Sequence, residues 1–312
     1  MNKKEIEKQC GYQLPSNIGF TLENNQLEVV ISNKSLDENM QEDSSAFEGW
    51  IICLMAIFKN DATNCIKSVN IQFNETPSFK NCSAKDLQFY YRLYKAQKNY
   101  GWTIEACDKI EEITSWKDKS IVLTTASAEA QKEAANIEAK LERIFIENHS
   151  NGKRKIYQQL PLGLFNNSVA KKNRLLPTSY LDMWEIDNNT LKLYELKAKR
   201  NTKVGILSEL IYYTNIIEDF IYGNYEFTKS KRDYRGIDKL KECQKEKCIK
   251  KIQGILLTDG LHPMIANNKE VILEILNNRK NTTTLDIIFS FEEKQGLFIR
   301  LQRFQRKRKS AS

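Results

Sequence analysis

One segment near the middle of the chain restricts the choice of fold more than any other. Two strand-like runs, 180–186 and 191–198, flank residues 187–190, whose sequence Asp-Asn-Asn-Thr is typical of a tight hairpin turn. The run 204–222 comes next, and its apolar residues recur at helical spacing. A hairpin followed by so apolar a helix predicts a sheet with a helix packed on its face.

Strand and helix patterns also alternate through the rest of the chain. Before the hairpin, the predicted elements are strands at 26–32 and 66–73 and helices at 46–58, 86–98 and 128–148. After the helix at 204–222 they are a strand at 252–258, a helix at 268–277 and strands at 283–291 and 297–304. The aromatic residues at 89–91 favour a place in the core over base stacking. This order predicts an α/β protein.

The length of the chain predicts two domains. Its 312 residues are about twice the ~150 residues of a typical domain. Hydrophobic periodicity lapses at 117–127, so we place the boundary there. We predict an amino-terminal accessory α/β domain of unassigned role at 1–125, a second domain at 126–304 and a basic, disordered tail at 305–312.

The positive charge of the chain is concentrated in its second half. Residues 1–125 carry 14 Lys and Arg against 17 Asp and Glu, so the net charge of +8 arises entirely from residues 126–312. The stretch 229–251 has ten basic and four acidic residues, and 300–312 has six basic and none acidic. Such patches predict a polyanion partner, above all nucleic acid. The alternative, left open at this point, is a solvated surface with a solubilising tail.

Basic residues around the hairpin and in the stretch 229–251 are the expected contacts to nucleic acid. They are Lys171, Lys172, Arg174, Lys199, Arg200, Lys203, Lys231, Arg232 and Arg235.

Several classes of protein do not fit this composition. Seven scattered cysteines are not a disulfide framework, and two histidines are too few for most triads or zinc sites. No window approaches the ~20 apolar residues of a membrane span, and the charged amino end is not a secretory signal. We therefore expect a cytoplasmic protein without a membrane partner, whose chemistry depends on carboxylates and lysines.

The register of the hairpin places two carboxylates together. A turn at 188–189 puts Asp182 opposite Glu195, and Lys197 lies on the same face as Glu195 because side chains alternate along a strand. Like charges that face each other on a sheet are destabilising unless a cation lies between them. Mg²⁺, or Mn²⁺ in its place, suits such a pair because it takes oxygen ligands from one or two carboxylates, substrate phosphate and water.

This arrangement resembles the signature of the PD-(D/E)XK nuclease superfamily, in which an aspartate precedes a hairpin that carries Glu-x-Lys and leads into a helix. The resemblance covers about residues 128–304. It implies a mixed sheet flanked by helices, the restriction-endonuclease-like core. It also implies that Asp182 and Glu195 bind the metal and that Lys197 is the catalytic lysine.

Two flanking elements extend the resemblance. The family often carries an acid on the preceding helix, for which Glu142 or Glu138 is available, and Glu209 with Tyr213 resembles its acid and tyrosine on the following helix. The chain departs from the family at the proline that usually stands just before the aspartate, because Pro177 lies five residues upstream.

Glu-x-Lys alone is a weak signal, since it begins here at Glu138, Glu195 and Glu292. The copy at Glu138 lies in a helical pattern, where residues i and i+2 do not share a face. The copy at Glu292 falls in a predicted turn with no helix after it. Only the Glu195 copy combines a strand, an opposed aspartate and a helix. The competing interpretation is an ordinary surface Glu/Lys pair.

We therefore predict a Mg²⁺-dependent nuclease that hydrolyses phosphodiester bonds of DNA, as an endonuclease of restriction or defence type. RNA as substrate and a homodimeric state are left open. The alternative is a catalytically inactive module on the same fold that binds nucleic acid or another protein.

Overall fold

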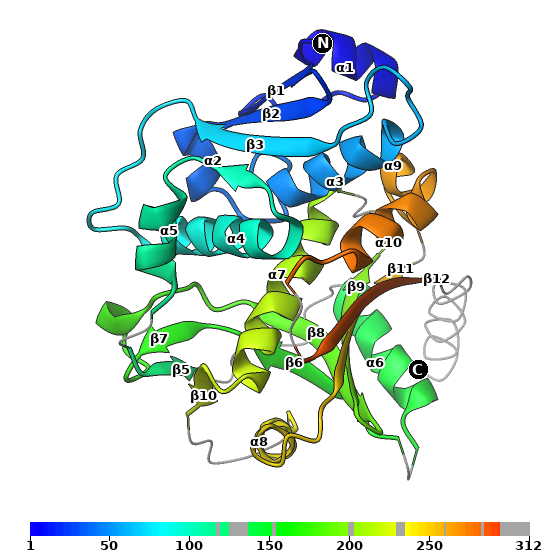
Figure 1. Ribbon diagram of the computed structural model, residues 1–312. Coiled ribbons are helices and arrows are strands. Elements are labelled where there is room, and N and C mark those ends of the chain that lie inside the picture. The colour runs from blue at the N-terminus through cyan, green and yellow to red at the C-terminus, as the bar shows by residue number, and fades with distance from the viewer. Residues whose placement is uncertain are drawn as a thin grey trace, which may run out of the picture.

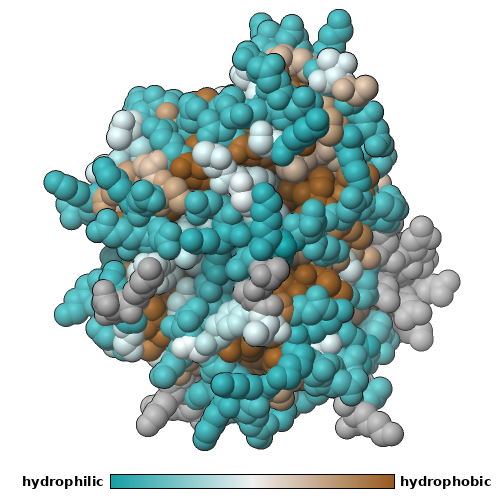
Figure 2. Space-filling model, in the orientation of Figure 1, coloured by the Kyte–Doolittle hydropathy of each residue, from teal (hydrophilic) through white to brown (hydrophobic). Residues whose placement is uncertain are grey.

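A computed structural model of the protein describes residues 1–116, 119–124, 137–151, 154–198, 203–228, 235–258, 260–281 and 284–293. These residues form three sheets and the helices that cover them (Figure 1). No helix among them is long and apolar enough to cross a membrane. The face of the molecule in Figure 2 is mainly hydrophilic. The combination of sheets and helices confirms the predicted α/β class.

The amino-terminal sheet has the strand order β1 (Ile18–Glu23), β2 (Gln26–Ile31), β3 (Ser68–Phe73), β4 (Thr103–Ile104). Strands β2, β3 and β4 are parallel, whereas β1 and β2 form an antiparallel hairpin. At its tip, Asn24 and Asn25 have left-handed backbones with φ of 50° and 65°, which two-residue hairpin turns favour. Strands β2 and β3 confirm the predicted strands, and β1 was not predicted.

The helices of the amino-terminal half lie near this sheet (Figure 1), and those between β2 and β4 connect its parallel strands. They are α1 (Lys3–Cys10), α2 (Asn33–Asp37), α3 (Phe47–Ile57), α4 (Ala84–Tyr100) and α5 (Cys107–Thr114). Helix α4 begins with a capping box in which Ser83 and Asp86 each accept a hydrogen bond from the other's backbone. Phe89, Tyr90 and Tyr91 are buried, which confirms their predicted place in the core.

A small second sheet joins segments that are far apart in the sequence. Its order is β10 (Tyr225–Phe227), β5 (Ile121–Leu123), β7 (Leu164–Asn166), with β5 and β10 parallel. Strand β5 lies within 117–127, where the sequence predicts a domain boundary. The boundary segment thus pairs with strands from later in the chain, and the division at residue 125 stays a prediction.

The third sheet is mixed and consists of strands from the second half of the chain. Its order is β12 (Asp286–Glu293), β11 (Lys251–Thr258), β9 (Thr190–Lys197), β8 (Tyr180–Asp187), β6 (Tyr157–Pro161). Strands β12, β11 and β9 are parallel, and β9, β8 and β6 are antiparallel.

Helices α6 (Ile137–His149) and α7 (Gly205–Ile221) pack on opposite faces of this sheet (Figure 1). Phe145 of α6 packs with Tyr194 and Leu196, whereas α7 belongs to the cluster that contains Leu193. The remaining helical segments are η1 (Lys171–Asn173), α8 (Ile237–Lys245), α9 (Pro263–Ala266) and α10 (Lys269–Asn277).

The hairpin has the predicted register. Asp187 pairs with Thr190, and the ladder continues to Met183 opposite Tyr194. Counting one residue further places Asp182 opposite Glu195. The turn residue Asn188 has the left-handed backbone (φ 54°) that Asn tolerates better than most residues.

The two halves of the chain share one continuous hydrophobic core. Trp50 and Ile51 of α3 belong to the same buried cluster as Leu207 and Ile211 of α7. The helices approach closely at Gly49, where a Cβ atom would lie 2.6 Å from the carbonyl oxygen of Val204. Glycine at this position therefore allows α3 to pack against the start of α7.

Other predictions differ from the structure or lie outside its described residues. Glu292, predicted in a turn, lies within β12, because that strand extends to Glu293. Helix 128–148 is described only from Ile137 onward, where it forms α6. The predicted strand at 297–304 and the tail at 305–312 lie outside the described residues.

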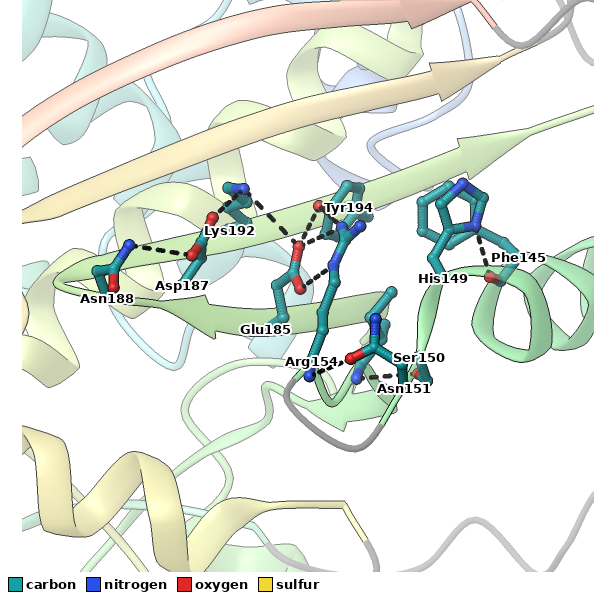
Figure 3. Close-up of polar contacts among 11 residues, drawn as sticks. Phe145, His149, Ser150, Asn151, Arg154, Glu185, Asp187, Asn188, Lys192 and Tyr194 are labelled. Carbon is teal, nitrogen blue, oxygen red and sulfur yellow. Dashed lines mark hydrogen bonds and ion pairs between the residues drawn. The ribbon is translucent and has the colours of Figure 1, made fainter.

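A buried carboxylate, Glu185, holds the hairpin to the segment that follows α6 (Figure 3). Arg154 donates one hydrogen bond of 2.6 Å to each carboxylate oxygen of Glu185, and the Tyr194 hydroxyl donates a third of 2.6 Å to the same carboxylate. Burial favours the neutral acid, but these hydrogen bonds outweigh burial and lower the pKa of Glu185. The ionised Glu185 therefore stabilises the hairpin.

We predict that Glu185→Gln lowers the free energy of unfolding by about 1 to 3 kcal/mol at pH 7, because it weakens charge-assisted hydrogen bonds. The loss is limited to this range because Arg154 is partly exposed, and solvent screens its interaction with Glu185. Since the folded pKa is below the ordinary 4.5, this stability is present above pH 4.5 and is lost as the pH falls further. Urea denaturation measures both effects. The control, Asp187→Asn at the exposed tip, should cost under about 1 kcal/mol. Equal losses in the two variants would contradict the assignment.

Candidate functional site

The predicted catalytic residues line one cavity of about 670 Å³ at the end of the third sheet. Strands β6, β8 and β9 and helices α6 and α7 contribute side chains to it, and so does the amino-terminal half of the chain. The lining residues from the first half are Glu38, Asn39, Met40, Gln41, Lys85 and Gln88. Those from the second half include Glu138, Glu142, Arg143, Gln158, Gln159, Tyr180, Asp182, Glu195, Lys197, Glu209, Tyr213 and Arg235.

A row of buried charged side chains forms the centre of the site. The Lys197 ammonium lies 2.6 Å from Glu195 Oε1 and 3.0 Å from Glu209 Oε2. These three side chains are 5%, 1% and 3% exposed. Tyr213, one helical turn after Glu209, donates a hydrogen bond of 2.9 Å to Glu209 Oε1. The structure therefore brings Glu195 and Lys197 of the hairpin together with Glu209 and Tyr213 of α7.

Asp182 lies beside these charged side chains, near the start of β8. Its Oδ2 accepts a hydrogen bond of 2.7 Å from the backbone N–H of Leu196, the residue between Glu195 and Lys197. The contact ties the aspartate to the strand that carries the other two catalytic candidates. Asp182 is half-buried and faces the cavity.

Helix α6 supplies two further carboxylates. Glu142, a predicted catalytic residue, is buried and accepts a hydrogen bond of 3.0 Å from Gln159 on β6. Glu138 accepts one of 3.2 Å from the backbone N–H of Ala198, just after β9. Gln159 has a left-handed backbone (φ 54°), a conformation that most residues avoid and that often occurs at functional sites.

Burial and the charges of the cluster shift the pKa of Asp182, Glu195 and Lys197. Burial, together with repulsion from neighbouring carboxylates, raises the pKa of Glu195 and of Asp182 well above the usual range. Burial alone would lower the pKa of Lys197, but the surrounding carboxylates outweigh it and raise the pKa. Lys197 is therefore an ammonium, and the carboxyl groups of Asp182 and Glu195 bind protons more readily than exposed acids do.

The donor set fits a hard divalent cation that retains several waters. Glu195 Oε2 is buried and has no hydrogen-bond partner within the described part of the chain, although an unpaired buried carboxylate oxygen is costly. Asp182 supplies a second carboxylate from the neighbouring strand. No group of three or more His, Cys, Asp or Glu side chains that could hold a metal ion occurs among the described residues. Two carboxylates nevertheless match Mg²⁺, which takes its remaining ligands from substrate and water.

Of the predicted nucleic-acid contacts that the structure describes, most do not line this cavity. Lys171, Lys172 and Arg174 are exposed near η1 and do not line it. Lys203 forms an ion pair of 2.6 Å with Glu42. Lys199, Arg200, Lys231 and Arg232 lie outside the described residues.

Arg235 alone among the described basic candidates lines the cavity. Its guanidinium lies 5.5 Å from the centre of the Tyr180 ring, and the residue is buried. It therefore belongs to the cavity wall, which differs from the exposed phosphate contact that the sequence predicts.

The sequence did not reveal the contribution of the first half to the cavity. Gln41, Lys85 and Gln88 carry no local pattern that sets them apart from other polar surface residues. Arg143 carries no such signal either, because adjacent residues of a helix do not share a face.

Comparisons with protein-family models, with curated proteins and with solved structures found no match. The resemblance to PD-(D/E)XK nucleases therefore rests on the residues of this chain alone.

The pKa of Glu142 provides a test of the site that needs no ligand. Burial, with a contribution from Glu138, raises this pKa from 4.5 to about 7. The folded state therefore binds more protons than the unfolded state between these values, and stability falls as the pH rises from 4.5 to 7. Glutamine cannot ionise, so Glu142→Gln should match the wild type at pH 5 and exceed its unfolding free energy by about 1 to 3 kcal/mol at pH 8.

Urea denaturation in EDTA at both pH values measures this difference. Glu147→Gln, on the exposed face of the same helix, is the control and should show no such dependence. An equal effect of Glu142→Gln at both pH values would contradict an elevated pKa.

Proposed function

We propose that the protein is a metal-dependent nuclease that hydrolyses phosphodiester bonds of DNA, with a restriction-endonuclease-like core in its second half. The observation that carries the proposal is the buried pair Glu195 and Lys197 beside the half-buried Asp182, in which one oxygen of Glu195 lacks a hydrogen-bond partner among the described residues. Such an unsatisfied acid destabilises the fold unless a ligand completes it, so a functional role accounts for it best.

Asp182 and Glu195 would hold Mg²⁺ or Mn²⁺ in this cavity. When bound, the cation would lower the pKa of a coordinated water and offset negative charge on the reacting phosphate. The Lys197 ammonium is close enough to both glutamates to be held in one position, from which it can orient the attacking water or a phosphate oxygen. Glu209 restrains Lys197, and Tyr213 restrains Glu209.

The charge distribution supports nucleic acid as the substrate class. The net charge of +8 arises from residues 126–312, which include the predicted catalytic residues, and the exposed Lys171, Lys172 and Arg174 are available for backbone contacts. DNA hydrolysis in a restriction or defence role, Mg²⁺ as the metal and a cytoplasmic location remain parts of the proposal.

The metal ligands are tested by Asp182→Asn and Glu195→Gln, which keep side-chain size and remove a charge. We expect each to reduce metal-dependent cleavage by at least ~10²-fold while the protein remains folded, since each removes a charged ligand. Circular and linear DNA and RNA should be incubated with Mg²⁺, Mn²⁺ or EDTA. Asp187→Asn, at the tip of the same hairpin, should retain wild-type activity. Full activity of either site variant would exclude the proposed metal site.

Lys197 is expected to act on the reaction more than on binding. Lys197→Met should lower single-turnover cleavage by at least ~10²-fold and change the Kd for DNA by less than about threefold, because transition-state charge is what the ammonium stabilises. Filter binding in Ca²⁺ and quenched-flow cleavage in Mg²⁺ measure the two quantities. Parallel losses in both would identify Lys197 as a simple phosphate contact. Circular dichroism must accompany the assay, because removing the ammonium leaves two buried carboxylates uncompensated.

A further inference from the structure

A segment of the amino-terminal half, 38–45, is docked against the start of α7. The backbone of Gln41 lies so close to Gly205 that a Cβ atom there would overlap its carbonyl group. On the outer side, Glu42 forms an ion pair of 2.6 Å with Lys203. These contacts hold the segment, termed here the docking segment, at the edge of the cavity, where its residues Glu38 to Gln41 form part of the wall.

One side chain of the docking segment reaches the catalytic groups. The Gln41 amide donates a hydrogen bond to Glu209 Oε1, the same oxygen that accepts from the Tyr213 hydroxyl. The other oxygen of Glu209 lies 3.0 Å from Lys197 Nζ. Two donors on one oxygen restrict rotation of the carboxylate and direct its second oxygen toward Lys197. A continuous line of contacts therefore runs from Gln41 through Glu209 and Lys197 to Glu195.

The chemical type of this donor matters as much as its position. A lysine or arginine at position 41 would compete with Lys197 for the charge of Glu209. A neutral amide satisfies one lone pair of the buried Glu209 carboxylate and leaves its charge available. Glutamine can therefore orient Glu209 without weakening the interaction of Glu209 with Lys197.

We propose that Gln41 is a positioning residue of the catalytic cavity, which orients Lys197 through Glu209 and makes the amino-terminal half a part of the catalytic unit. The inference rests on the proposed function. It goes beyond that function because it assigns a catalytic contribution to the half of the chain that lacks the sequence signature. Gln41 itself acts through Glu209 and has no direct role at the reacting phosphate.

The test uses the full-length protein with Gln41→Met, which keeps the length of the side chain and removes the donor. We expect kcat on DNA with Mg²⁺ to fall about 10-fold to 100-fold, the range for losing a hydrogen bond to a charged group, while KM changes less than about twofold. Rates should be normalised to the folded fraction from circular dichroism. Gln41→Ala, which leaves room for a water molecule, replaces the methionine variant if that variant does not fold.

Glu42→Gln is the matched control, because it weakens the neighbouring ion pair with Lys203 and leaves the line of contacts to Lys197 intact. It should keep kcat within about twofold of the wild type. If Gln41→Met has wild-type kcat, or if both variants lose kcat equally, Gln41 only contributes to docking and the inference is overturned. If the wild-type protein cleaves no nucleic acid under any metal condition, the proposed function fails, and the inference fails with it.

Discussion

The structure depends on the enclosure of helix α7 by protein on every side. All residues from Gly205 to Phe220 are buried, although the helix contains several polar and charged side chains. A buried polar group is costly unless it is hydrogen-bonded, and a buried charge is more costly still. Several polar residues of α7 have partners on other elements, and these contacts connect α7 to the rest of the chain.

Most of those partners come from the amino-terminal half. Ser208 accepts a hydrogen bond from Gly49, Asn215 accepts one from Asn99, and Asp219 forms an ion pair of 2.6 Å with Lys95. Further along the chain, Arg279 forms an ion pair of 2.8 Å with Glu218. Glu209 belongs to the same series, since Gln41 satisfies one of its oxygens. The polar contacts that join the two halves thus also set the geometry of the candidate site.

Each face of the hairpin carries a buried glutamate, and the two glutamates differ in how completely their oxygens are hydrogen-bonded. Glu185, on the face toward α6, has hydrogen bonds at both oxygens and a lowered pKa, so it is fully used in holding the strands (Figure 3). Glu195, on the opposite face, keeps one buried oxygen without a partner among the described residues, and burial raises its pKa. The first arrangement is complete as it stands, whereas the second leaves one carboxylate oxygen unused within the described part of the chain.

The sequence by itself determined the elements and the local part of the site. Strand and helix periodicity located β2, β3, α3, α4, α7, β11 and α10, and the turn at 188–189 set the register that brings Asp182, Glu195 and Lys197 to one face. These features are local, because side-chain alternation and turn geometry act over a few residues. Only the tertiary structure decided that Gln41 meets Glu209, 168 residues away, and that Arg235 is buried in the cavity wall. Such contacts follow from the packing of whole helices and sheets, and the energy of that packing is distributed over many residues. The residues that come into contact therefore carry no local sequence pattern.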